Sequence, residues 1–330
     1  MDEFYNNDFI SMSEQRKKEK RKLRSSYNKV CLAIILNLIV SLCVGLFYGI
    51  IAQIISLPMD GIVLDIVDFC SYGLSMLIPA WVIYLLYKRT AIFPSLSVIR
   101  GREFFPGLAL SFGATFLGSV ATNIVAIFGS SWGLQFTQPD FTAPKGGLEF
   151  FIYFLQMTIG AGLFEELLFR GAVLGALRRY GDKTAIVVSA LLFGIVHANL
   201  VQMPFAFVLG IYYGYMVCKT GSLLYPIIFH SVNNAISCLI TSAGEIGGEG
   251  LLETLSGFYV LSCIVLGAVG LIIELTRRRR GTTPHLLPEK GVLSVFEKVW
   301  QLVASPSFWA LIIFYGIFAI QYISVVSIDG

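Results

Sequence analysis

Long apolar runs separated by short polar segments dominate the pattern along the chain. Most runs have close to the roughly 20 residues that an α-helix needs to cross about 30 Å of hydrocarbon. Nine transmembrane helices are predicted, near residues 30–57, 69–87, 104–128, 149–172, 184–201, 204–218, 222–241, 257–275 and 306–327. The fifth and sixth runs are short, and Pro204 separates them. The pattern therefore predicts an all-α, polytopic transmembrane helix bundle of about nine spans.

Composition supports lipid as the main solvent. Of the 330 residues, 56% are hydrophobic and only 14% are charged, whereas a soluble domain needs more polar surface. The first apolar run is too long for the core of a signal peptide and has no small-residue cleavage pattern after it. We expect it to remain attached as the first transmembrane helix.

Basic residues lie on alternate connecting segments. Of the 24 Lys and Arg residues, all except Lys145 and Arg170 lie in the N-terminal tail or in every second loop after it. The positive-inside rule makes that side cytoplasmic. We therefore expect an integral protein of the cell (plasma) membrane with its N-terminus in the cytoplasm and its C-terminus outside. The run Arg16–Arg24 is interpreted as an orientation signal in a solvated tail.

An amphipathic pattern precedes the last span. Apolar residues at helical spacing from Val292 to Val303 predict a short interfacial helix. Ser305 and Pro306 are a suitable cap and first-turn pair for the span that follows.

Polar and ionisable residues well inside the apolar runs gather on three central helices. A charge at the bilayer centre costs on the order of 2.5–3.5 kcal/mol on insertion scales, so such residues need a reason. They are Glu165, Glu166 and Arg170 in the fourth run, His197 in the fifth, and His230, Asn233 and Asn234 in the seventh. Hydrogen bonds between transmembrane helices average only about 0.6 kcal/mol, too little to explain this cluster as structural glue. A functional site is the favoured interpretation.

Helical geometry sorts these residues into pairs. Glu166 and Arg170 are four residues apart and can form an ion pair on one face. Glu165 is rotated by about 100° from Glu166, which leaves its carboxylate without a local partner. His230 and Asn234 are also four residues apart. Small residues nearby allow the helices to approach closely, namely Gly160, Gly162, Gly171, Gly175, Gly194, Gly210 and Gly214.

These groups suit the hydrolysis of an amide. A carboxylate shielded from bulk water can take a proton from water, and imidazole and amide N–H groups can stabilise an oxyanion. Glu165 with His197 is the predicted base, and His230 with Asn234 the predicted oxyanion stabiliser. No serine or cysteine has an obvious base beside it, so direct attack by water is the simplest reaction. We expect activity to fall in acid as Glu165 becomes protonated.

At these residues the sequence resembles the CAAX-protease and bacteriocin-processing (Abi) family of intramembrane glutamate-dependent peptidases. The family's motifs EExxxR, FxxxH and HxxxN occur in order, at Glu165–Arg170, Phe193–His197 and His230–Asn234. The resemblance covers roughly residues 148–241. It implies a peptidase in which the first glutamate activates water with the help of His197, and in which His230 and Asn234 stabilise the oxyanion. Glu166 and Arg170 would support this geometry.

The chain then divides into four segments. We expect a cytoplasmic basic tail (1–29), three N-terminal transmembrane helices (30–147), a CAAX-protease/Abi-like catalytic core (148–241), and C-terminal transmembrane helices with a basic cytoplasmic loop (242–330). The expected partners are the lipid bilayer and a peptide or protein substrate at the membrane. No nucleic-acid partner is expected, because the net charge is only +3.

Three alternatives remain open. A metal-dependent peptidase would use glutamate and histidine ligands, but there is no HExxH motif, and we expect no metal and no cofactor. A non-catalytic immunity or peptide-binding protein would tolerate the loss of Glu165. A proton-coupled transporter would also use intramembrane carboxylates, but repeated halves are not found.

The depths of the site residues conflict in this scheme. At 1.5 Å per residue, Glu165 and His230 lie about 10 Å from the cytoplasmic ends of their spans, whereas His197 lies nearer the opposite face. A fifth helix that starts near Gly181-Asp182, with Asp182 as a possible cap, would resolve the conflict.

Overall fold

The computed structural model describes residues 2–56, 61–97, 99–139, 147–281 and 286–325, with side chains from residue 11 onward. The parts of the expected spans at residues 57 and 326–327, and Lys145, lie outside these residues. Within them the backbone is almost entirely helical, which confirms the expected helical class.

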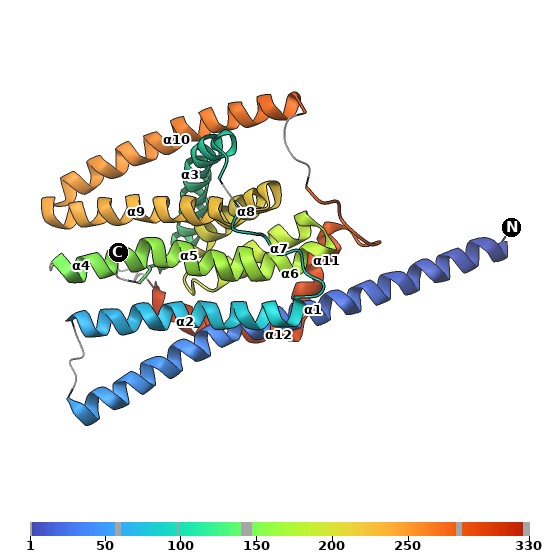
Figure 1. The fold of residues 1–330 in the computed structure, drawn as a ribbon, viewed down its shortest axis with the longest axis horizontal. Coiled ribbons are helices and arrows are strands. Elements are labelled where there is room, and N and C mark those ends of the chain that lie inside the picture. Colours follow the sequence, from blue (N-terminus) through green and yellow to red (C-terminus); the bar gives the residue numbers. More distant parts are fainter. Residues whose placement is uncertain (1, 57–60, 98, 140–146, 282–285, 326–330) are drawn as a thin grey trace.

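Helices account for nearly all of the bundle (Figure 1). Their bounds are α1 (Asp2–Ile55), α2 (Gly61–Tyr87), α3 (Gly101–Ser131), α4 (Gly147–Leu155), α5 (Ala161–Glu166), α6 (Leu174–Leu177), α7 (Asp182–Ile195), α8 (Gln202–Thr220), α9 (Leu224–Gly247), α10 (Glu249–Arg279), α11 (Val295–Val303) and α12 (Pro306–Ala319). Helices α4, α5 and α6 form one continuous rod, since π-helical stretches join them at Gln156–Gly160 and Leu167–Val173.

Length and apolar character identify fewer membrane-spanning helices than the expected nine. Five described helices are long and apolar enough to cross a membrane: Ser11–Ile55, Gly61–Tyr87, Gly101–Ser131, Gly147–Tyr180 and Glu249–Arg279. A sixth arises if α11 and the segment Pro306–Tyr322, which are bent by 63° relative to each other, are counted as one span. The chain is thus an integral membrane helix bundle, but the count of nine is not supported.

The fifth predicted span is wrong in its bounds. It was expected to cover residues 184–201, but α7 begins at Asp182 and ends at Ile195. Its 14 residues extend only about 21 Å, less than the hydrocarbon thickness. Ala198, just beyond its end, has a φ of 52°, in the left-handed region that a helix cannot continue through. The start near Asp182 is confirmed. Its role as a cap is wrong, because Gly181 occupies the cap position and the Asp182 carboxylate pairs with Arg178.

The end of the chain also departs from the helical pattern. The last span was expected over 306–327, but α12 ends at Ala319 and is followed by the short strand β2 (Ile323–Val325). This strand pairs antiparallel with β1 (Leu134–Phe136), so that Leu134 lies opposite Val325. The pair connects the end of α3 to the end of α12.

The basic N-terminal segment is a continuation of α1 that is partly packed against the protein. Leu23 and Tyr27 are fully buried, and the side chain of Arg24 donates to the amide oxygen of Gln301 on α11. The expected interfacial helix is present as α11, where Ser294 and Glu297 form a capping box. Ser305 takes the N-cap position of α12 but makes no side-chain cap.

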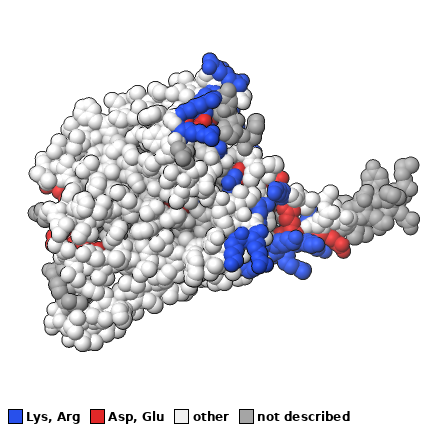
Figure 2. Space-filling model, in the orientation of Figure 1, with Lys and Arg blue, Asp and Glu red and all other residues white. Residues whose placement is uncertain are grey.

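Charge is strongly polarised along the bundle. Figure 2 shows Lys and Arg gathered at the end where the N-terminal half of α1 projects; acidic residues are visible both among them and at the opposite end, where no Lys or Arg is visible in this view. In Figure 1 the N-terminal half of α1 and the strand β2 lie at opposite ends of the bundle. The side with the basic side chains is called the basic end below.

Close helix contacts hold the central helices together. A Cβ placed on Gly162 of α5 would lie 2.9 Å from the backbone nitrogen of Ser231 on α9. A Cβ placed on Gly210 of α8 would lie 2.9 Å from Cα of Ala190 on α7. Only glycine allows these approaches, as expected for small residues at transmembrane interfaces.

Candidate active site

The two glutamates lie on α5, between the two π-helical stretches of the long central rod. π-Helical turns are uncommon and frequently occur at functional sites. Glu166 is fully buried, and its Oε1 atom accepts a hydrogen bond from Nη1 of Arg170 at 2.9 Å. This ion pair is the one predicted from the four-residue spacing.

His230 joins the Glu166 carboxylate to the neighbouring helix α9. Its Nδ1 atom lies 3.0 Å from Oε1 of Glu166, and its Nε2 atom lies 3.8 Å from Oε2 of Glu165. The second separation is too long for a direct hydrogen bond. The imidazole therefore lies between the two carboxylates and is held by Glu166.

Aromatic rings enclose the charged pair on the other sides. The guanidinium of Arg170 is fully buried and stacks over the ring of Phe193 at 4.1 Å and the ring of Tyr213 at 5.6 Å. Tyr213 also stacks against His230, with ring centroids 5.6 Å apart. Such contacts stabilise a buried cation and fix its position.

Glu165 has a partner that was not predicted from the sequence. The hydroxyl of Tyr72 on α2 donates a hydrogen bond to Oε1 of Glu165. Oε2 of Glu165 accepts no hydrogen bond from the described residues. The only sequence signal for Tyr72 is a hydroxyl in an apolar run, which it shares with other tyrosines of the chain.

His197 follows the end of α7 instead of lying on it. Its Nδ1 atom bonds to the backbone oxygen of Phe193 at 2.8 Å. A carbonyl oxygen can only accept, so Nδ1 carries the proton and Nε2 is the remaining nitrogen. His197 nevertheless lines the same cavity as Glu165 and His230, so the three side chains are brought together despite the conflict in depth that the predicted spans gave.

Asn234 is the last of the predicted site residues. Its side-chain nitrogen donates to the backbone oxygen of Met157, in the first π-helical stretch, at 3.0 Å. This contact ties α9 to the first π-helical stretch.

One cavity brings the predicted residues together. It has a volume of about 430 Å³, and its lining includes Tyr72, Gln156, Glu165, His197, His230 and Asn234. This space is called the catalytic cavity below. Glu166 and Arg170 lie behind it, buried, and reach it through His230. Among the described residues, no group of three His, Cys, Asp or Glu side chains could hold a metal ion.

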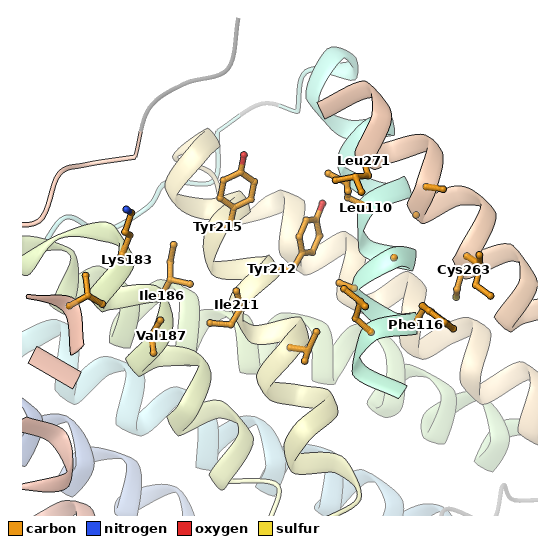
Figure 3. Close-up of a pocket in the computed structure, with 18 residues that line it drawn as sticks. Leu110, Phe116, Lys183, Ile186, Val187, Ile211, Tyr212, Tyr215, Cys263 and Leu271 are labelled. Atoms are coloured by element: carbon orange, nitrogen blue, oxygen red, sulfur yellow. The ribbon is translucent and has the colours of Figure 1, made fainter. Parts of the chain in front are cut away.

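A larger, apolar cavity of about 880 Å³ lies elsewhere in the bundle, between α3, α7, α8 and α10 (Figure 3). Figure 3 shows Leu110, Ile211 and Leu271 along it, with Lys183 at one side. Lys183 is the one charged residue among the described residues that line this larger cavity. The larger cavity and the catalytic cavity have no described lining residue in common. The carboxylate and imidazole groups predicted for the site therefore line the catalytic cavity and not this larger one.

Carboxylate, imidazole and amide groups thus line one cavity of a helical membrane bundle, where ionisable residues mark a candidate functional site. A family comparison identifies the class further. Residues 147–236 match the model of the type II CAAX prenyl endopeptidase Rce1-like family. Over this segment the chain is similar to that family of endopeptidases. No curated protein and no solved structure matches the chain.

Proposed function

We propose that this protein is an intramembrane endopeptidase that hydrolyses a membrane-associated peptide or protein with water activated by Glu165. The observation that carries the proposal is the position of the Glu165 carboxylate and the hydrogen bond that it accepts. Tyr72 holds one of its oxygens, the other accepts no hydrogen bond from the described residues, and Glu165 lines the catalytic cavity together with His197, His230 and Asn234. A positioned carboxylate that faces a polar cavity is suited to act as a general base.

The reaction follows from this arrangement. Glu165 takes a proton from a water molecule, and the water oxygen attacks the carbonyl carbon of the substrate. The resulting oxyanion collapses, the C–N bond breaks, and the proton passes from Glu165 to the leaving nitrogen. Each transfer occurs at one carboxylate, so the site needs no separate nucleophile.

The remaining side chains are assigned supporting roles. His197 would hold the water beside Glu165 through Nε2, because its Nδ1 atom is used by the Phe193 carbonyl. Asn234 retains a second amide hydrogen for the oxyanion, since only one is used by Met157. His230 would donate to the oxyanion through Nε2 when both ring nitrogens carry protons. Glu166 and Arg170 would fix the orientation of His230.

The proposed orientation places the basic end in the cytoplasm of a cell bounded by the plasma membrane. The short helices α7 and α8 do not affect this assignment. α7 begins just after Arg178 and Arg179, and α8 ends at Lys219, so the pair leaves and returns to the basic end. The N-terminus would then be cytoplasmic and the C-terminus external.

Hydrolysis can be tested with purified protein in detergent and a peptide pool in water enriched in heavy oxygen. The proposal predicts fragments that carry heavy oxygen in their new C-terminal carboxyl group, at a rate that a chelator does not change. Loss of cleavage with chelator and recovery with zinc would favour the metal-dependent alternative. If no peptide or membrane protein is cleaved, while a Glu165→Gln variant keeps its role in cells, the binding-protein alternative holds.

A further inference from the structure

The catalytic cavity continues into a second cavity, also of about 430 Å³. The two share four lining residues: Met157, Gln202, Phe205 and Asn234. We call the second space the polar cavity. The remaining residues that line it are Ser119, Thr122, Asn123, Gln138, Tyr153, Val201, Asn233, Ser237, Cys238 and Thr241.

Ten of the fourteen described residues that line the polar cavity carry a hydroxyl or a side-chain amide. No Asp, Glu, Lys, Arg or His is among its described lining residues. The side-chain amides of Asn123 and Gln138 make no hydrogen bond to the part of the chain that the structure describes. Such amides offer both donors and acceptors, which match the N–H and C=O groups of an extended peptide.

The polar cavity extends away from the basic end. Tyr153 is six residues from the start of α4, and Thr241 is six residues from the end of α9, so each lies about 9 Å from those helix ends. Both ends are opposite the basic loops. The side chains of Asn123, Gln138, Ser237 and Thr241 are exposed. The cavity is therefore open in its outer part.

Packed side chains close the site toward the basic end. Phe169 and Arg170, which follow the glutamates along the helix in that direction, are fully buried. Phe229, which precedes His230 on α9, and Tyr213 on α8 are also fully buried. A peptide approaching from the basic end would have to displace this layer.

We propose that the substrate reaches Glu165 through the polar cavity, from the end of the bundle opposite the basic loops, as an extended and uncharged peptide segment. This inference rests on the proposed function. With the proposed orientation it selects a secreted peptide or the external part of a membrane protein, and not a segment presented from the cytoplasm.

Proteoliposomes of known orientation test the direction of access. A fluorogenic peptide that the detergent-solubilised wild type cleaves is added outside vesicles, and protease sensitivity of the N-terminal tail identifies its side. The proposal predicts that the added peptide is cleaved by those protein molecules whose N-terminal tail lies inside the vesicle. Cleavage only by molecules whose tail is outside would overturn the inference and leave the peptidase function intact. Failure of the solubilised wild type to cleave any peptide would instead contradict the proposed function.

A labelling readout does not depend on activity. Ser237→Cys places a thiol in the polar cavity, and a membrane-impermeant maleimide is added to vesicles with the tail enclosed. Labelling above that of the wild type, which carries six cysteines, supports the inference. Labelling only when the tail side is accessible overturns it.

Two variants test whether the polar cavity binds the peptide. Asn123→Leu and Thr241→Val each remove one hydrogen-bonding group, and we expect KM to rise about three- to tenfold with kcat unchanged. Thr254→Val is the matched control, because Thr254 is exposed on α10 and does not line either cavity. Equal kinetics for Thr241→Val and Thr254→Val would contradict peptide binding in this cavity.

Discussion

The Nδ1 atom of His230 lies 3.0 Å from Oε1 of Glu166, the same carboxylate oxygen that accepts from Arg170. One buried oxygen thus links α5, α9 and the second π-helical stretch. Because Glu166 is fully buried and does not line the catalytic cavity, it is poorly placed to act as a base. The adjacent Glu165, which faces the catalytic cavity, is the better candidate.

The ion pair between Glu166 and Arg170 should be essential for stability. Both side chains are fully buried, so Arg170→Met leaves a carboxylate without its main countercharge. We expect a loss of about 3–5 kcal/mol in the free energy of unfolding, measured in detergent. The double variant Glu166→Gln/Arg170→Met should lose less than the sum of the two single variants.

Arg89→Met is the control for this comparison of single and double variants. Arg89 is exposed, so its replacement should change the free energy of unfolding by less than about 0.5 kcal/mol. Strict additivity of the two buried substitutions would show that the residues do not depend on each other.

Tyr72→Phe tests whether the tyrosine positions the Glu165 carboxylate, the proposed base. The substitution removes only the hydroxyl that donates to Glu165. We expect kcat to fall about ten- to a hundredfold with little change in KM, because a hydrogen bond to a charged group is lost. Tyr84→Phe on the same helix is the matched control, since Tyr84 is 48% exposed and lies outside the catalytic cavity. Equal effects of the two variants would remove Tyr72 from the site.

Gly162→Ala tests the close approach of α5 and α9. The added methyl group would press against Ser231 and lie 3.0 Å from the backbone oxygen of Ile227. Overpacking of this kind costs about 1–3 kcal/mol, so the unfolding temperature should drop. Gly171→Ala is the control on the same rod, since its nearest neighbour, Leu223, would be 3.5 Å away. An unchanged unfolding temperature for Gly162→Ala would show that the helices separate easily.

Glu289 should make stability depend on pH. Burial opposes its ionisation, but hydrogen bonds from Lys298 and Thr184 outweigh burial and hold the pKa of this carboxyl below its ordinary value. A lowered pKa in the folded state stabilises the protein above the pKa of the unfolded chain, about 4.3, and this contribution is lost as the pH falls further.

The unfolding temperature of Glu289→Gln should therefore lie below that of the wild type near pH 7, and the two should converge at about pH 3. A difference that persists unchanged in acid would assign the effect to packing and not to charge.

Local spacing allowed part of the site to be predicted from the sequence. The pair of Glu166 and Arg170 follows from a four-residue separation on one helix, which depends only on helical geometry. The same reasoning identified Glu165 as the carboxylate without a partner on its own helix. Its actual partner, Tyr72, is 93 residues away, and no local pattern distinguishes it among 15 tyrosines.

The position of His197 depended on where a helix ends. Apolar residues continue past Ile195, so their pattern extended the predicted helix to residue 201. In the structure the chain turns after Ile195, and the side-chain oxygen of Asn199 accepts a hydrogen bond from the backbone N–H of Gln202. Asparagine is a strong helix N-cap residue, and this signal was available in the sequence. The π-helical stretches have no comparable sequence signal.

The most direct test of the central claim compares peptide cleavage by purified wild type, Glu165→Gln and Glu149→Gln. The amide keeps the shape of the Glu165 side chain and removes the base, whereas Glu149 lies in the first turn of α4, outside the catalytic cavity. We expect products to form with wild type and Glu149→Gln, and to vanish with Glu165→Gln while this variant remains folded. Cleavage by Glu165→Gln at the wild-type rate would contradict the proposed role of Glu165.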